Sequence, residues 1–126
     1  MKERFSGTSV TFIHVADRQR TLAFYRDTLG LDLVSADDYG DFLDLGGGLL
    51  RITVVPGHQP HSHPVLGWNV KQIVSAVAVL RDKGLKFTFY DGFEQDDLGI
   101  WTSPDGHTRI AFFADPDANV LTLSQV

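Results

Sequence analysis

The sequence predicts an α+β fold made of two β-α-β-β-β modules, and two observations support this. One helical pattern lies between strand patterns in each half of the 126-residue chain, in the same order. The segment "PGHQPHSHP", residues 56–64, separates the halves as a linker, because such dense proline interrupts both helices and strands. Since neither half is long enough to bury a core alone, we expect a single domain, residues 1–126, with modules 8–55 and 65–126.

The first half shows one strand, one helix and three more strands. Thr8–Val15 is rich in β-branched residues and predicts a strand. Asp17 can cap a helix that runs to about Leu29, and Gly30 is suited to ending it. Three further strands are predicted at residues 31–38, 39–47 and 49–55.

The second half repeats this pattern. Residues 71–83 predict a helix, because Ile73, Val77 and Leu80 recur at helical spacing, and Gly84 follows them. We expect each sheet to turn one face to its helix and the other to a shared cavity. Strands are predicted at "VLGWNV", "LKFTFYD", "LGIWTS", "HTRIAFF" and "NVLTLSQV", residues 65–70, 85–91, 98–103, 107–113 and 119–126.

Composition excludes several classes of function. The formal net charge of −5 argues against nucleic acid and against an anionic membrane surface as partners. The sequence has no cysteine, so disulfides, thiolate nucleophiles and cysteine metal sites are ruled out. No stretch reaches the roughly 18 apolar residues of a membrane span. These features predict a protein of the cytoplasm.

Three segments carry a resemblance to a known family: "DRQRTLAFYRDTLGL", "VAVLRDKGLKF" and "AFFADPDANVLTLSQ". With them the chain resembles the vicinal oxygen chelate superfamily, the glyoxalase, bleomycin-resistance and extradiol-dioxygenase group, over nearly its whole length. The resemblance implies a cup-shaped mixed sheet and a homodimer. It leaves function open, because this fold serves lyases, dioxygenases, epimerases, thiol transferases and drug-sequestering proteins.

The resemblance also implies where a family metal would bind. Members that use a metal direct four side chains from four strands into the cup, usually His, Glu or Gln. The corresponding positions here are Val10, Arg51, Val65 and Thr122, with Thr53 as an alternative for the second. Two hydrocarbons, a guanidinium that only donates hydrogen bonds and a neutral hydroxyl are a poor ligand set for a divalent cation. We therefore expect no family metal and no other cofactor.

The same placement predicts which residues line the cavity. If Val10 faces the cup, strand alternation puts Phe12 and His14 on the same face. Arg51 is the first candidate for a ligand anchor, holding a carboxylate or phosphate, and a structural salt bridge to Asp41, Asp44 or another acid is the alternative. The candidate ligand-binding residues are Arg51, His14, Phe12, Asn69, Trp101 and Thr122.

Histidines and aromatic residues each have two interpretations. His14 is the candidate catalytic residue, as a general base, or a packed histidine whose hydrogen bonds are satisfied. The linker histidines either chelate zinc with a ligand from elsewhere or lie in a solvated loop; they are His58, His61 and His63. The aromatic rings either stack on a planar ligand or serve as core or dimer contacts; they are Trp101, Phe42 and Phe113.

Two functions follow from these expectations. The first is a metal-free protein that binds a small organic ligand in the cup. The second is a glyoxalase-like lyase or dioxygenase-like enzyme that uses a displaced metal site or metal-free acid–base chemistry at His14.

Overall fold

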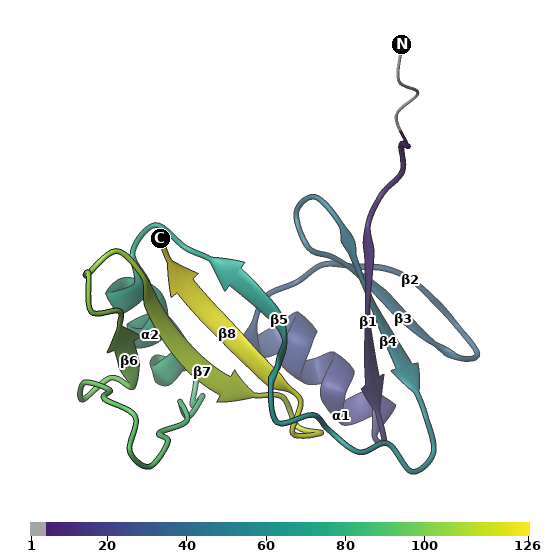
Figure 1. Ribbon diagram of the computed structural model, residues 1–126. Coiled ribbons are helices and arrows are strands. Elements are labelled where there is room, and N and C mark those ends of the chain that lie inside the picture. The colour runs from purple at the N-terminus through teal and green to yellow at the C-terminus, as the bar shows by residue number, and fades with distance from the viewer. Residues whose placement is uncertain (1–4) are drawn as a thin grey trace. The chain divides into compact units, whose positions relative to one another are not determined.

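The structure, a computed structural model, describes residues 5–126 and contains two compact units (Figure 1). The first unit is Met1–His58 and the second is Gln59–Val126, so the division falls within the predicted linker. Each unit holds one four-stranded sheet and its own helix. The predicted α+β class and the two β-α-β-β-β modules are thereby confirmed.

In the first module, β1 and β2 are the two edge strands; β1 lies parallel to β4, whereas the other pairings are antiparallel. Asp17 caps the helix as predicted, since its carboxylate accepts a hydrogen bond of 3.1 Å from the Arg20 backbone N–H. The final helical turn is a π-helix that continues α1 directly. The elements are β1 Val10–Val15, α1 Arg18–Ala23, η1 Phe24–Thr28, β2 Leu33–Asp37, β3 Gly40–Asp44 and β4 Leu49–Val54.

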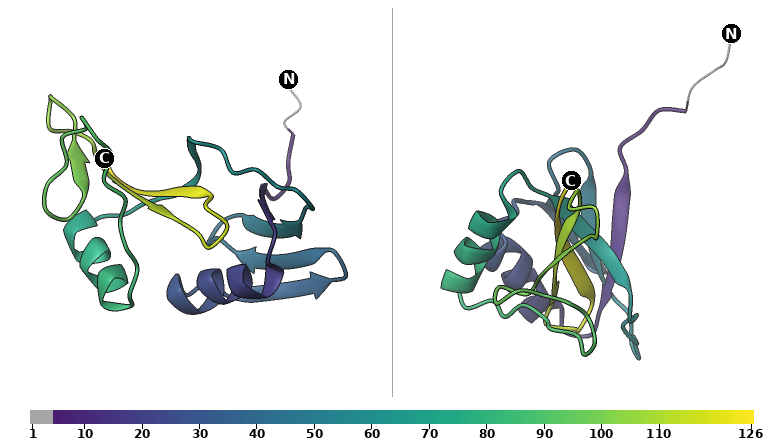
Figure 2. Two further views of the ribbon diagram at one scale, coloured as in Figure 1. Left: turned by 90° about the horizontal axis from the view of Figure 1, so that it is seen from below. Right: turned by 60° about the vertical axis from the view of Figure 1, so that its left-hand side comes forward.

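One face of this sheet forms the core of the first module. Alternate residues of the strands are buried on the face where α1 packs against β4 (Figure 2). Tyr25 of the π-helical turn is fully buried with them. The buried strand residues are Ile13, Val15, Leu43, Leu50 and Ile52.

The second module repeats this topology. The sheet order is β5-β8-β7-β6, with β5 at the edge and parallel to β8. The helix packs against β7 and β8, over core residues Ile73, Val77, Ala111, Phe113, Leu121 and Leu123. The elements are β5 Pro64–Asn69, α2 Ile73–Asp82, β6 Ile100–Thr102, β7 Arg109–Ala114 and β8 Val120–Gln125.

Both helices are short. Gly30 and Gly84 follow their ends with φ angles of +78° and +92°, a left-handed conformation that glycine adopts without steric cost. The α2 helix has ten residues and α1 has six. Within residues 5–126, no helix is long and apolar enough to cross a membrane.

The strand predicted at residues 85–91 is wrong. Only Phe87 forms a bridge, to Phe113 of β7, and the rest of the segment belongs to a loop. The Gln95 side chain takes the place of a ladder, because its amide donates to the carbonyls of Thr88 and Gly99 at 2.9 and 2.8 Å. Its oxygen accepts from the Tyr90 N–H at 2.8 Å. The apolar alternation of this segment reflects ring packing rather than strand pairing.

Candidate functional site

The first module has an uncovered face, on the side of its sheet opposite α1, and we call it the first open face. Strand register places Phe12, Arg51 and Phe42 in one row across β1, β4 and β3. Val10 and His14 share this face with Phe12 by alternation, and all three are exposed. The structure therefore brings together three of the predicted ligand-binding residues, namely Phe12, His14 and Arg51.

Arg51 lies across this face in an ion pair. Its Nη2 donates to both carboxylate oxygens of Asp37 at 2.8 and 3.0 Å. The guanidinium carbon stands 4.5 Å from the ring centre of Phe42, in cation–π contact. Arg51 is only 8 % exposed, so its charged side chain is largely shielded from solvent. The salt bridge considered from the sequence exists, but its partner is neither Asp41 nor Asp44.

Gly40 makes room for this arrangement. A side-chain carbon at Gly40 would stand 3.3 Å from the guanidinium carbon of Arg51. Gly40 and Asp37 are paired in register at the β2–β3 turn, so Arg51 crosses β3 above the glycine to reach Asp37. The ion pair therefore ties the edge strand β2 to β4 across the strand that separates them.

Asp37 is stabilised as a carboxylate. The hydrogen bond from Arg51, followed by those from the backbone N–H groups of Tyr39 and Gly40, holds its pKa below its ordinary value. A carboxylate whose pKa is lowered by folding stabilises the protein above its ordinary pKa. That contribution is lost as pH falls through the lowered value.

Substitution of Arg51 by leucine should raise the pKa of Asp37 toward the ordinary value of 3.8, because the strongest hydrogen bond to the carboxylate disappears. Carbon-detected NMR titration of the side-chain carboxyl measures this pKa directly. Asp44 in the same module serves as an internal reference, since Arg51 makes no ion pair with it. An unchanged Asp37 titration in the variant would contradict the assigned ion pair.

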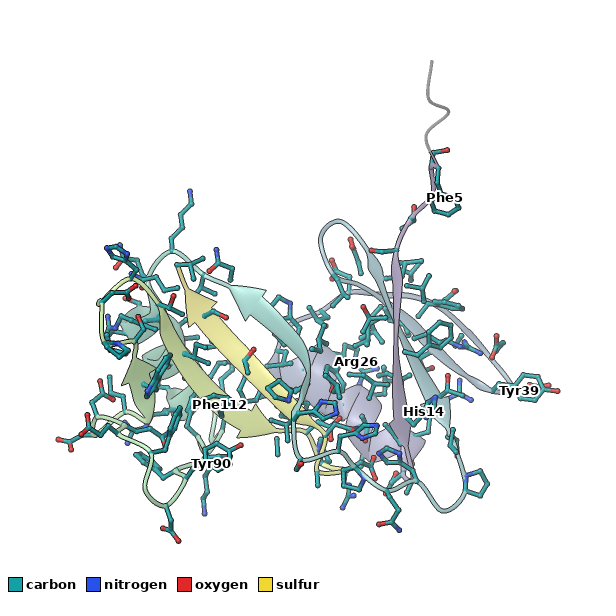
Figure 3. The ribbon with its side chains drawn as sticks, in the orientation of Figure 1. Phe5, His14, Arg26, Tyr39, Tyr90 and Phe112 are labelled. Atoms are coloured by element: carbon teal, nitrogen blue, oxygen red, sulfur yellow. The ribbon has the colours of Figure 1, made fainter. Side chains whose placement is uncertain are left out.

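The histidines of the first module form a pair. His14 lies on β1 and His58 lies in the loop after β4. Their ring centres are 6.0 Å apart, and the two ring planes are nearly perpendicular. Figure 3 shows His14 on the edge strand. His61 and His63 belong to the second unit and stack on each other at 4.8 Å. Across residues 5–126, no three His, Cys, Asp or Glu side chains gather as a metal site would require.

The second module also has a face opposite its helix, the second open face. Register aligns Gly67, Thr122 and Phe112 across β5, β8 and β7. The Thr122 hydroxyl fills the space where a side chain at position 67 would lie. Asn69 is exposed on the same face, and its side-chain oxygen accepts a hydrogen bond of 3.3 Å from the Val126 N–H. Val65 lies within a register shift of β5 and is half-buried.

Four aromatic rings gather on the second open face. Phe93 of the loop stacks on Trp101 of β6, with ring centres 5.5 Å apart and 10° between planes. Tyr90 packs edge-on against Phe112, with ring centres 5.3 Å apart (Figure 3). The ring centres of Phe93 and Phe112 are 5.9 Å apart. We call Tyr90, Phe93, Trp101 and Phe112 the aromatic cluster. Tyr90 and Phe93 remain 39 % and 37 % exposed, so the cluster is partly open to solvent.

The sequence identified Trp101 in this cluster but missed the other three rings. Of the two interpretations given for Phe113, the core is the one observed, because alternation in β7 directs it inward, where it is 1 % exposed. The loop that carries Tyr90 and Phe93 has no strand or helix period from which their direction could be predicted.

A family model, Glyoxalase/Bleomycin resistance protein/Dioxygenase superfamily, matches residues 8–123. The chain belongs to this superfamily. No curated protein sequence matched the chain significantly.

Several solved structures share this fold at low sequence identity. TnmS3, an antibiotic binding protein from Streptomyces sp. CB03234, is 24% identical with a TM-score of 0.71, covering 98% of this chain and 98% of its own. The fosfomycin resistance protein FosX from Listeria monocytogenes is 15% identical, with a TM-score of 0.76, and the match covers 98% of this chain and 95% of FosX. A glyoxalase family protein from Enterococcus faecalis is 21% identical with a TM-score of 0.74, covering 95% and 98%.

The four positions that the sequence resemblance assigns to metal ligands carry side chains that are poor donors for a divalent cation. In the first module these are Val10, which has no donor atom, and Arg51, which carries a positive charge already bonded to Asp37. In the second module they are Val65 and Thr122, a hydrocarbon and a neutral hydroxyl. Thr53, the alternative second position, also offers only a hydroxyl.

Proposed function

We propose that this superfamily member binds a small organic molecule without using the divalent metal of its enzymatic relatives. The aromatic cluster carries this proposal. Large apolar rings held partly open to solvent are typical of binding surfaces, and flat rings bind flat ligands by stacking. The residues at the metal-ligand positions support the metal-free half of the proposal. Structural relatives include a protein described as antibiotic binding and one described as conferring fosfomycin resistance.

Charge narrows the ligand class. The net charge of −5 favours a neutral or cationic ligand over an anionic one. The loop between Tyr90 and Trp101 contains the acids Asp91, Glu94, Asp96 and Asp97 and no basic residue. We therefore propose a planar, neutral or cationic ligand for the aromatic cluster.

Proflavine, a planar cationic acridine, is a suitable probe. We expect it to quench Trp101 fluorescence in a Trp68→Phe background, which leaves Trp101 as the single tryptophan. Phe93→Ala should weaken binding by up to about tenfold, because a lost ring stack costs up to about 1.5 kcal/mol. Phe89→Ala is the matched control, since Phe89 is an exposed ring of the same loop outside the cluster. Equal binding by both variants would contradict the assigned surface.

Metal analysis tests the other half of the proposal. The purified protein should contain far less than one equivalent of zinc, nickel, manganese or iron. The alternative is an enzyme of the lyase or dioxygenase type, and the contact between His14 and His58 is the observation that favours it. A stoichiometric metal lost on replacing His14 by alanine would support that alternative and overturn the metal-free proposal.

We also propose a homodimer, as the superfamily resemblance implies. Sedimentation equilibrium at several concentrations would measure the molar mass. A mass of about 14 kDa at every concentration, the mass of one chain, would contradict it.

A further inference from the structure

The second module has a pocket beside the C-terminal end of α2. Its volume is about 270 Å³, close to the roughly 300 Å³ at which pockets for small ligands begin. The end of the helix, the segment that follows it and the loop before β6 form its walls. We call it the basic pocket, and its lining includes Arg81, Leu85, Lys86, Phe87, Asp97 and Leu98.

The basic pocket lies on the helix side of the sheet, away from the aromatic cluster. Phe87 forms a bridge with Phe113 of β7, and the centres of their rings are 5.6 Å apart. Since Phe113 is a core residue on the side of α2, Phe87 points to that side as well. Phe112, the residue of the cluster on β7, points to the opposite side by alternation. The pocket is therefore a separate site, and an inference about it does not depend on the proposed function.

Two cations of the basic pocket have no counter-charge among residues 5–126. Arg81 and Lys86 are exposed, and neither forms an ion pair with an acid of this part of the chain. Asp97 also borders the pocket, but it lies beyond ion-pair distance of both cations. Two positive charges and one negative charge leave the pocket with a net charge of +1, in a chain whose net charge is −5. A local excess of positive charge attracts an anion to this place.

Arg81 lies on the side of α2 that faces the sheet. Ile73 and Val77 are fully buried under the helix, and Arg81 follows Val77 at a spacing of about one turn. The helix ends directly afterwards, because Lys83 is its C-cap and Gly84 follows with a φ of +92°. The side chain of Arg81 therefore begins where the apolar core ends, so the pocket joins apolar surface to a positive charge.

We propose that the basic pocket binds a small carboxylic acid with an apolar body, in its ionised form. The carboxylate accepts hydrogen bonds from the guanidinium of Arg81 and the ammonium of Lys86 at the mouth. The apolar body displaces water from half-buried Leu85, Phe87 and Leu98. An amine would be repelled by both cations, and inorganic phosphate has no apolar surface to bury. The charge and the lining together thus favour an apolar carboxylate.

Three compounds test the ligand class on the unmodified protein. Phenylacetate has both a charge and a ring, phenylacetamide lacks the charge, and acetate lacks the ring. We expect phenylacetate to shift the backbone amide NMR signals of Leu85, Phe87 and Leu98, and to bind at least about threefold more tightly than either other compound.

Three results of this titration would overturn the proposal. Equal binding of phenylacetamide or acetate would show that the charge or the apolar walls play no part. Shifts confined to the indole N–H of Trp101 would place the acid on the aromatic cluster. Signals of the pocket that respond to none of the three compounds would show that it binds no acid of this kind.

Arg81→Gln tests the assigned cation. It should weaken phenylacetate binding about threefold, because one of two exposed ion pairs is lost. Lys71→Gln is the matched control, since it removes the same charge about 15 Å away at the other end of α2, beyond the Debye length of roughly 8 Å. Asp97→Asn should tighten phenylacetate binding, because a repelling charge leaves the lining. Equal losses for Arg81→Gln and Lys71→Gln would show attraction by overall charge and would contradict the pocket.

Discussion

Replacing Arg18 by leucine should lower the free energy of unfolding by about 3 kcal/mol, because it leaves the carboxylate of Asp41 buried without its counter-charge. Arg18 holds both oxygens of Asp41 at 3.0 Å, through Nε and Nη2. Nη2 also donates to the carbonyls of Asp37 and Gly40 at 2.7 and 2.8 Å. The Asp41 side chain is only 3 % exposed, so water cannot replace these bonds. Chemical denaturation measures the loss.

The double variant Arg18→Leu/Asp41→Leu identifies the cause. If the uncompensated carboxylate dominates, the double variant should be more stable than Arg18→Leu alone, because no buried charge remains. Arg20→Leu on the same helix is the control, and its exposed side chain should change stability by less than about 0.5 kcal/mol. If the free energy of unfolding of the double variant falls by the sum of the losses of the two single variants, this explanation is ruled out.

Replacing Gly40 by alanine should cost about 3 kcal/mol of stability as well, because the new methyl group collides with backbone. It would overlap the carbonyl oxygen of Ile52 on the neighbouring strand, a group that cannot rotate away. It would also press against the guanidinium carbon of Arg51, and we therefore expect the pKa of Asp37 to rise in this variant.

Gly47→Ala provides the matched control for this prediction. Gly47 lies in the turn before β4, and no atom stands within 4 Å of the position of an added side-chain carbon. The free energy of unfolding of this variant should lie within about 0.5 kcal/mol of that of the native protein. Equal stability of the two alanine variants in thermal or chemical denaturation would contradict the close approach at Gly40.

Local patterns were enough to predict most of the fold. A run of β-branched residues identified β1, and a capping residue or helical spacing with a following glycine identified both helices. The strand predicted at 85–91 failed for a physical reason: its apolar residues pack as rings, and Gln95 supplies the hydrogen bonds that a neighbouring strand would have supplied. An alternating pattern shows which side chains are apolar, but it does not show whether the backbone of the segment pairs with another strand.

The candidate site was predicted less completely. Alternation correctly placed Phe12 and His14 on one face, and the register set Arg51 beside Phe12. The acid that pairs with Arg51 could not be identified, because that choice depends on how β2 aligns with β3 across a turn. The ring of Phe93 could not be placed either, since its direction is set by loop contacts with no period in the sequence.

The loop fastened by Gln95 gives the second module an unusual freedom. A strand needs a continuous run of suitable residues, whereas this loop is anchored by a few side chains that bind backbone groups, including the amide of Gln95 and the carboxylate of Asp96. The residues between the anchor points can therefore diversify by mutation without dismantling the sheet beside them. Because Tyr90 and Phe93 belong to this loop, the aromatic surface that we propose for ligand binding can change by mutation while the sheet stays constant.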